Sequence, residues 1–385
     1  MRNLKKIVNP YDEEKVISSC SIFGIMDLNG NRFSGKDVLL GIENMHVRGN
    51  GLGGGFACYG LYPQYPDHYA LHIMYNTRDS KDETEKFIER NFFLARAEEI
   101  PTRVIDKIDD PPQFWRYFVK PKTNQPERCH DDYVVRLVMN INTQIEDTYV
   151  FSSGKNMGVF KGVGYPEDIG RFFMIEDYKG YIWTAHGRFP TNSPGWWGGA
   201  HPFNILDWTV VHNGEISSYG INKRFLEMYG YNCSLYTDTE VIAYAADLLM
   251  RKHKISVEIA SKVFAPPLWN QIDHMEPKEK QLYTMLRQVY GGLLMNGPFS
   301  VIIARQGEMI GLTDRIRLRP LTAAITGRKL YLSSEESAIR LVEPDLERTW
   351  IPKGGEPIIG RLDSKEIIYN DELSWTKLER RIKQI

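Results

Sequence analysis

Five residues spread along the chain carry groups that together could open an amide bond. Cys20 stands near the N-terminus, Arg188 in the middle, Asn213 and Gly214 after an apolar run, and Asp238 where a helical pattern begins. A cysteine attacks a carbonyl carbon as its thiolate, and it needs a nearby base to form that thiolate at neutral pH. These groups follow one another as a thiol, a fixed cation, an Asn-Gly corner and a carboxylate. Such a set could bind an amino acid and attack an amide that the amino acid carries.

The sequence shows no obvious Cys-His-Asp set that could supply the base for Cys20. If Cys20 were the first residue of the mature chain, its own α-amino group, with a pKa of about 7.7 to 8.0, could take up and return the proton. This hypothesis requires that residues 1–19 be removed. The other cysteines, Cys58, Cys129 and Cys233, are widely spaced without a C-x-x-C pair, which argues against a disulfide framework and against a zinc site.

Composition excludes several classes of protein. The 385 residues include 48 Lys and Arg against 49 Asp and Glu, a net charge of −1. The net charge therefore gives no indication that the chain binds nucleic acid or an anionic membrane. No apolar run approaches the ~20 residues that a membrane span needs, and the N-terminus lacks the apolar stretch of a signal peptide. We therefore expect a cytoplasmic protein whose partners are small molecules or other proteins.

Apolar periodicity predicts short strands and a few long helices. Helical spacing is found over residues 34–47, 83–99 and 240–252. Thr237-x-x-Glu240 matches a capping box at the start of the last helix. Short β-branched and aromatic runs predict strands over 21–26, 148–151, 159–160, 181–185 and 208–212. Two hairpins are expected, 299–304 with 309–312 and 321–325 with 330–333. This pattern indicates an α+β protein in which two antiparallel sheets pack face to face, with helices outside.

Two stretches have competing interpretations. Asn213-Gly214 lies between apolar runs, where Asn-Gly is a preferred hairpin turn, so a turn could itself present the polar groups. Residues 79–144 are charged and irregular apart from one helical stretch, which predicts a helical and irregular elaboration on a core. The aromatic run 114–118 within it is more typical of ordinary packing than of a docking surface.

The amino-acid sequences of four segments resemble those of the class II glutamine amidotransferases, which are N-terminal-nucleophile (Ntn) hydrolases. These segments are Cys20–Ile25, His186–Asn192, Val211–Glu215 and Thr237–Glu240. Within that family, the loop 188–203, with its Trp196-Trp197 pair, is most similar to the glutaminase domain of glutamate synthase.

The resemblance implies a fold and a division of the chain. The fold is the Ntn-hydrolase four-layer αββα sandwich of two antiparallel sheets, formed by residues 20–345. Residues 1–19 would be a propeptide or N-terminal extension, 79–144 a family-specific elaboration, and 346–385 a C-terminal extension.

The resemblance also implies catalytic roles. Cys20 would be the nucleophile, while the side-chain amide of Asn213 and the backbone N–H of Gly214 would donate to the developing oxyanion. Family members usually have Gly directly after the nucleophile. Ser21 stands there in this chain, and its side chain could crowd the backbone or alter processing.

Four further residues match positions that bind substrate. Arg188 matches the arginine that grips the α-carboxylate of glutamine, for which a planar guanidinium is well suited. Thr191 matches a position that adds a hydroxyl contact, and Asp238 matches the one that receives the α-ammonium. Arg48 resembles the family arginine close to the nucleophile.

The implied reaction is hydrolysis of L-glutamine to glutamate and ammonia through a γ-glutamyl thioester on Cys20. Ammonia escapes in water, so such domains feed a synthase site. After Pro344 only about 40 residues remain, without a phosphate-cradling loop or cluster-binding cysteines. The resemblance therefore implies a separate flavin-dependent synthase subunit, most similar to that of glutamate synthase. We expect FMN and an iron–sulfur cluster on that partner, and no cofactor or metal in this chain.

Other interpretations remain open. The chain could serve an N-methylglutamate synthase-like complex, in which methylamine joins the glutamyl unit. It could instead be a non-catalytic glutamine-binding regulatory or assembly subunit, for which an unprocessed N-terminus and Ser21 would be suitable. A free-standing Ntn amidase would not need both Arg188 and Asp238, and a phosphoribosyl-transferring enzyme would need an acceptor domain.

Overall fold

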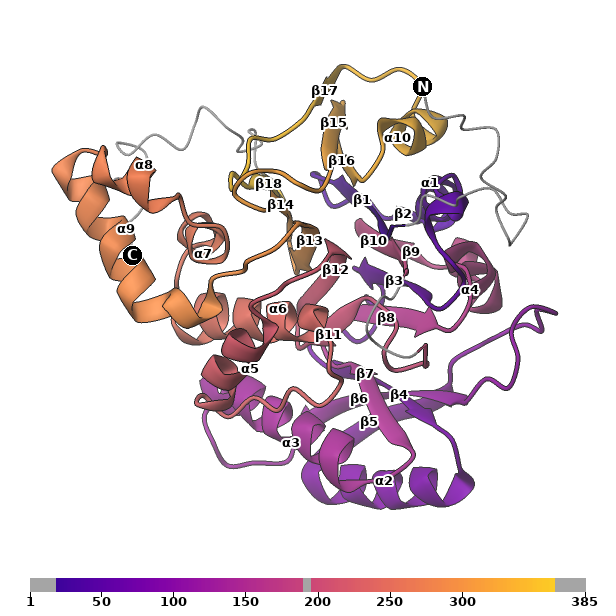
Figure 1. Ribbon diagram of the computed structural model, residues 1–385. Coiled ribbons are helices and arrows are strands. Elements are labelled where there is room, and N and C mark those ends of the chain that lie inside the picture. Colours follow the sequence, from indigo (N-terminus) through magenta and orange to yellow (C-terminus); the bar gives the residue numbers. More distant parts are fainter. Residues whose placement is uncertain (1–18, 190–194, 364–385) are drawn as a thin grey trace, which may run out of the picture.

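The computed structural model describes residues 19–189 and 195–363, and two antiparallel sheets form its centre (Figure 1). The seven-stranded sheet has the order β17 (Arg348–Trp350), β15 (Thr322–Thr326), β16 (Lys329–Ser333), β1 (Ser21–Asp27), β10 (Ile182–Gly187), β3 (Gly54–Tyr59) and β8 (Met157–Gly162). The five-stranded sheet has the order β11 (Phe203–Ile205), β12 (Trp208–Gly214), β13 (Phe299–Arg305), β14 (Glu308–Thr313) and β18 (Ile358–Arg361). Two short strands, β2 (Phe33–Ser34) and β9 (Lys179–Gly180), pair beside them.

Strand β1 shows how the two sheets meet. All seven of its residues are buried. On one face, Phe23 packs so closely against α1 (Lys36–Glu43) that a Cβ added to Gly41 would lie 2.4 Å from its ring. On the other face, a Cβ added to Gly24 would lie 3.0 Å from Met309 Sδ and 3.1 Å from Ile302 Cδ1. A strand buried on both faces is expected where helices cover one side and a second sheet the other.

Helices cover the outer faces of both sheets (Figure 1). The seven-stranded sheet carries α1, α4 (Pro166–Phe172) and α10 (Glu336–Val342). The five-stranded sheet carries α6 (Asp238–Ala246), with α5 (Tyr219–Glu227), η5 (Asp247–Lys252) and α7 (Val257–Phe264) beside it. Further out lie α8 (Trp269–Asp273) and α9 (Pro277–Tyr290), and the single turns are η2 (His46–Arg48), η3 (Glu127–Cys129), η4 (Ile175–Asp177) and η6 (Gly291–Leu293). The expected four-layer αββα sandwich is confirmed. Within the described ranges, no helix is long and apolar enough to span a membrane.

The segment 79–144 is more regular than its sequence indicates. It supplies two strands of a third sheet, ordered β5 (Phe92–Glu99), β6 (Gln113–Pro121), β4 (Tyr69–Tyr75) and β7 (Thr148–Ser152), and the helices α2 (Arg78–Asn91) and α3 (His130–Gln144). The prediction of a helix over 83–99 is therefore wrong beyond residue 91. Strand β5 is an edge strand whose residues are mostly exposed, so it lacks the alternation of a half-buried strand.

The C-terminal hairpins agree with the prediction. Strands β13 and β14 turn at Gly307, and β15 and β16 turn at Gly327, both with positive φ. The sandwich continues beyond residue 345, where its end was predicted, because β17 extends the edge of one sheet and β18 the edge of the other.

Candidate active site

Cys20 lies at the entry to strand β1, in the centre of the seven-stranded sheet. The backbone N–H of Phe189 donates to Cys20 Sγ at 3.3 Å, and Sγ is 3.7 Å from the Phe189 carbonyl oxygen. Burial raises the pKa of the Cys20 thiol above its usual value, against the opposing effects of the Phe189 hydrogen bond and the Arg188 charge. A thiol in this state needs a base before it can attack.

Arg48 ties the start of the described chain to the site. Its Nε donates to the carbonyl oxygen of Cys20 at 3.2 Å and its Nη2 to Ser19 Oγ at 3.0 Å. Its Nη1 forms an ion pair of 2.7 Å with Glu335. Arg48 therefore contacts both residues that the Ser19–Cys20 bond joins, as expected for an arginine close to the nucleophile.

Arg188 follows β10 and is 3% exposed. Its backbone N–H donates to the carbonyl of Gly53 at 2.8 Å. Gly53 has φ +155°, and a Cβ there would lie 3.0 Å from Arg188 Cδ, so the glycine leaves room for the arginine stem. Burial lowers the pKa of Arg188, while Cys20 and Asp238 act to raise it. Arg188 directly precedes Phe189, whose backbone N–H donates to Cys20 Sγ.

Asn213 and Gly214 end strand β12 and pair with Ser300 and Phe299 of β13. The prediction of a two-residue hairpin turn at this corner is wrong, because long-range strand pairing overrides the local preference. Gly214 has φ +149°, and a Cβ there would lie 2.0 Å from the Pro298 carbonyl oxygen. Only glycine fits at this position, because the Pro298 carbonyl fills the space that a side chain would take.

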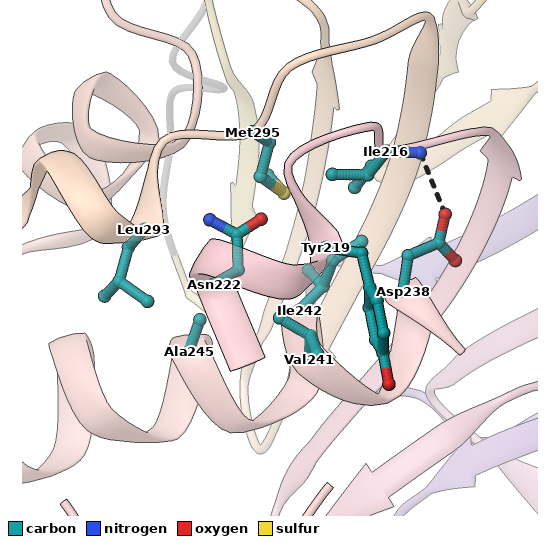
Figure 2. Close-up of a pocket in the computed structure, with 9 residues that line it drawn as sticks. All are labelled: Ile216, Tyr219, Asn222, Asp238, Val241, Ile242, Ala245, Leu293 and Met295. Carbon is teal, nitrogen blue, oxygen red and sulfur yellow. Dashed lines mark hydrogen bonds between the residues drawn. The ribbon is translucent and has the colours of Figure 1, made fainter. Parts of the chain in front are cut away.

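Asp238 begins helix α6, whose N-cap Thr237 accepts from the N–H of Thr239. Asp238 Oδ2 accepts from the N–H of Ile216 at 2.9 Å (Figure 2), and Oδ1 lies 3.3 Å from His212 Nδ1. Burial acts to raise the pKa of this carboxyl group, but His212 and the hydrogen bonds outweigh burial and hold the pKa below its usual value. The carboxylate is therefore charged at neutral pH.

The predicted capping box at this helix is only half formed. Thr237 caps as expected, but Glu240 accepts from the N–H groups of Ser234 and Leu235 instead of from Thr237. A small cavity of about 10 Å³ lies behind Asp238, lined by apolar residues such as Val241 and Met295 (Figure 2). It holds one water at most, so an amino acid has to approach Asp238 from another side.

The structure brings Cys20, Arg48 and Asn213 together around the Ser19–Cys20 bond. Arg188 precedes Phe189, which bonds Cys20 Sγ, and the charge of Asp238 acts on the pKa of Cys20 and of Arg188. Gly214 is next to Asn213, and Thr191 lies outside the described residues.

Ser19, Arg319 and Ser334 are residues of the site that the sequence did not reveal. Arg319 Nη1 donates to Ser19 Oγ at 3.2 Å. Ser334 Oγ lies 3.2 Å from Asn213 Nδ2. None of these residues stands in a spacing that indicates chemistry, because only the folded sheets bring them together.

Ser21, the departure from the family glycine, is accommodated by its partner strand. It is buried and pairs with Gly187 of β10, where an added Cβ would lie 2.5 Å from Ser21 Oγ. The hydroxyl fills the space that the missing side chain of Gly187 leaves.

Comparisons with known proteins found one family and several similar proteins. The class II glutamine amidotransferase profile matches residues 105–238, which include Arg188, Asn213 and Asp238. An uncharacterized protein of Archaeoglobus fulgidus is 59% identical over 94% of this chain and 96% of its own length. The amidophosphoribosyltransferase of Methanocaldococcus jannaschii is 25% identical over 57% of this chain, which spans 43% of that protein. Among solved structures, the glutamine phosphoribosylpyrophosphate amidotransferase of B. subtilis covers 91% of this chain and 49% of its own, at 15% identity and a TM-score of 0.46.

The αββα sandwich, with a cysteine at the entry to a central strand, is the fold of an Ntn-type hydrolase. Over residues 105–238, the chain matches the class II glutamine amidotransferase family.

Proposed function

We propose that this chain hydrolyses L-glutamine to glutamate and ammonia and passes the ammonia to a separate synthase subunit. The observation that supports this proposal is the surroundings of Cys20: Phe189, which directly follows Arg188, donates its N–H to Cys20 Sγ at 3.3 Å, and the charges of Arg188 and Asp238 both act on the thiol. One cation and one carboxylate match the α-carboxylate and α-ammonium of a free amino acid.

The mechanism begins with removal of residues 1–19, which leaves the α-amino group of Cys20 as the base. This group accepts the thiol proton, and the sulfur attacks the side-chain amide carbon of glutamine. The oxyanion accepts hydrogen bonds from Asn213 and Gly214. The amine then returns the proton to the leaving nitrogen, ammonia departs, and water hydrolyses the γ-glutamyl thioester to release glutamate and free Cys20.

The raised pKa of the Cys20 thiol supports this order of events. Because the thiol has a raised pKa, it stays protonated at neutral pH until a base is present. The α-amino group exists only after the Ser19–Cys20 bond is cleaved. A precursor with Ser19 attached is therefore expected to be inactive.

For the acceptor, we propose a flavin-dependent subunit of the glutamate synthase type, carrying FMN and an iron–sulfur cluster. The similarity of loop 188–203 to glutamate synthase supports this choice. The amidotransferase family supports a requirement for an ammonia acceptor. An N-methylglutamate synthase-like complex would use the same glutaminase chemistry with another acceptor.

The test has two parts. Intact mass spectrometry of the protein from its native host is expected to show a chain that begins at Cys20. That protein is expected to release ammonia from L-glutamine, and a Cys20→Ala variant is expected to release none. A fully active protein that retains Met1 would contradict the α-amino base, and an active Cys20→Ala variant would contradict the nucleophile.

A second function is favoured by the contacts of Ser19. Its hydroxyl lies within 3.3 Å of Asn213, Arg48 and Arg319, so the precursor is well ordered at this point. A glutamine-binding subunit that is never processed would keep these contacts. Native protein that retains residues 1–19, binds glutamine and releases no ammonia would support this alternative.

A further inference from the structure

Ser19, the residue directly before the candidate nucleophile, lies in a polar cage. Its Oγ is 3.0 Å from Arg48 Nη2, 3.2 Å from Arg319 Nη1 and 3.0 Å from Asn213 Oδ1. On its other side, Asn213 Nδ2 lies 3.2 Å from Ser334 Oγ, and Ser334 is 3% exposed. The Asn213 amide therefore stands between two serine hydroxyls.

Hydrogen-bonding capacity fixes which way this amide faces. A serine hydroxyl has one hydrogen and two lone pairs, and a guanidinium group can only donate. Arg48 and Arg319 fill both lone pairs of Ser19, so the Ser19 hydrogen has to be donated. This hydrogen has two acceptors in reach, Asn213 Oδ1 at 3.0 Å and the Cys20 carbonyl oxygen at 3.3 Å. Because both lone pairs of Ser19 are occupied, an Asn213 nitrogen would find no acceptor there, so Asn213 presents its oxygen to Ser19 and its nitrogen to Ser334.

This orientation is the reverse of the one that catalysis needs. An oxyanion requires a donor, and an amide oxygen that faces the reaction site would repel the developing negative charge. In the proposed function, on which this inference rests, Asn213 donates to the oxyanion after Ser19 has left.

Ser334 has the capacity to hold the amide in both orientations. One lone pair of its Oγ accepts from the backbone N–H of Ile22 at 3.1 Å. The Ser334 N–H donates to the Ile22 carbonyl at 3.0 Å, so strand β1 fixes the residue. The second lone pair and the hydrogen of this hydroxyl remain for Asn213. The Ser334 hydroxyl can therefore accept a hydrogen bond from Asn213 Nδ2 or donate one to Asn213 Oδ1.

We propose that Ser334 is a positioning residue for Asn213, and that removal of Ser19 reverses the Asn213 amide. Hydrolysis of the Ser19–Cys20 peptide bond consumes one water and leaves a carboxylate on Ser19 and an amino group on Cys20. Asn213 Oδ1 then loses its donor. The amide rotates by 180°, the Ser334 hydroxyl donates to Oδ1, and Nδ2 faces the reaction site. The Ser334 hydroxyl and the Asn213 amide are therefore hydrogen-bonded to each other in both states, with Ser334 accepting before removal of Ser19 and donating after it.

The first test measures orientation without depending on activity. Neutron diffraction would be compared between the Cys20→Ala precursor, which retains Ser19, and a chain produced to begin at Cys20. The Asn213 nitrogen is expected to face Ser334 in the precursor and to face away from it in the chain that begins at Cys20. If it faces Ser334 in both, the proposed reversal is wrong, whether or not the protein is a glutaminase.

The second test measures the role of Ser334 in the processed enzyme. Ser334→Ala is expected to lower kcat for glutamine by about tenfold with KM within twofold, because Asn213 then loses its enforced orientation. Ser334→Thr, which keeps the hydroxyl, is expected to restore most of kcat. Ser300→Ala is the matched control, since Ser300 is buried opposite Asn213 in β13 and its Oγ has no hydrogen-bond partner.

A third measurement separates this proposal from the proposed function. A glutamine analogue with an aldehyde in place of the amide forms a tetrahedral adduct with a cysteine. Ser334→Ala is expected to weaken its binding by the same factor as kcat and to leave the Kd of glutamate unchanged. If Ser334→Ala binds the aldehyde as tightly as the wild type does, and the wild type binds it through Cys20, then only the proposed role of Ser334 is contradicted. Absence of Cys20-dependent binding in the wild type would contradict the proposed function, while the diffraction result would still decide the reversal.

Discussion

Asp238 at the start of helix α6 accepts a hydrogen bond of 2.9 Å from the backbone N–H of Ile216 (Figure 2). Ile216 comes two residues after Gly214, so this bond joins the carboxylate to the segment that leaves strand β12. The position of the predicted ammonium acceptor is thereby coupled to the position of the predicted oxyanion donors. A substitution at Asp238 can remove charge without removing this link.

Asp238→Asn provides such a substitution. The amide oxygen of Asn can still accept from Ile216, but the negative charge is lost. We expect KM for L-glutamine to rise by about 10²-fold with a smaller change in kcat, because the α-ammonium loses its charged partner. Steady-state kinetics would measure this change.

Two comparisons make this test specific. Asp273→Asn removes a carboxylate that forms a surface ion pair with Lys280, and it is expected to leave KM unchanged. Glutaric acid monoamide, which lacks the α-ammonium, is expected to be an equally poor substrate for the wild type and for Asp238→Asn. If the wild type hydrolysed this amide as well as glutamine, the charge-matched clamp would be ruled out.

Much of the sandwich could be predicted from local sequence. Gly307 marks the turn of one hairpin, and the apolar run of β1 indicated a buried strand. The prediction failed where long-range pairing decides the structure. Asn213-Gly214 has a strong local preference for a turn, yet its pairing with β13 keeps it in a strand. The exposed edge strand β5 carries too few apolar residues to show a period of two.

The candidate site was predictable only in part, for a similar reason. Cys20 and Asp238 stand in matched segments, so the resemblance revealed them. Ser334 follows β16 and reaches the site only because β16 pairs with β1, more than 300 residues away from it in sequence. Arg319 comes from a loop after β14. No local pattern predicts such contacts, because they depend on strand order.

A double-mutant cycle tests the packing of Ser21 against Gly187. Gly187→Ala is expected to destabilise the protein by about 1–3 kcal/mol, since the new Cβ would overlap Ser21 Oγ. Ser21→Gly is expected to cost about 0.5–1 kcal/mol alone, as glycine does within a strand. In the double variant the overlap is removed, so its loss of unfolding free energy is expected to be smaller than the sum of the two. Denaturant unfolding measures all three, and strict additivity would show that the two residues are not in contact.

His186 gives the protein a pH-dependent stability. Its Nε2 lies 2.9 Å from the His212 carbonyl oxygen, and burial lowers its pKa to about 3. In the unfolded chain the pKa of histidine is about 6.5. Between these values the unfolded state binds a proton that the folded state does not, so the free energy of unfolding falls as pH falls below about 6.5.

The His186→Gln variant isolates this effect, because Gln can donate to the same carbonyl and does not titrate. Between pH 7 and pH 5, the wild type is expected to lose about 2 kcal/mol of unfolding free energy relative to the variant. Guanidinium titrations at several pH values would measure the difference. If the two curves are parallel across this range, His186 is not the buried neutral group that the structure indicates.

Gly162→Ala tests how the loop that follows Arg188 is held. A Cβ at Gly162 in β8 would lie 2.1 Å from the Trp197 ring, so the ring has to move. The neighbouring Lys161 donates to the carbonyl of Gly198 at 2.8 Å and fixes the same part of the loop. We expect the variant to fold with a loss of about 1–3 kcal/mol, and KM for glutamine to rise about tenfold, because the displaced loop no longer supports substrate binding.

Tryptophan fluorescence and steady-state kinetics on the same sample would measure both effects. Gly291→Ala is the matched control, since no atom lies within 4 Å of a Cβ at Gly291; it is expected to change neither fluorescence nor KM. A changed fluorescence with an unchanged KM would mean that Trp197 packs at Gly162 but that this part of the loop has no role in binding glutamine. If neither changes, the ring does not occupy the space above Gly162, and the anchoring role of β8 is contradicted.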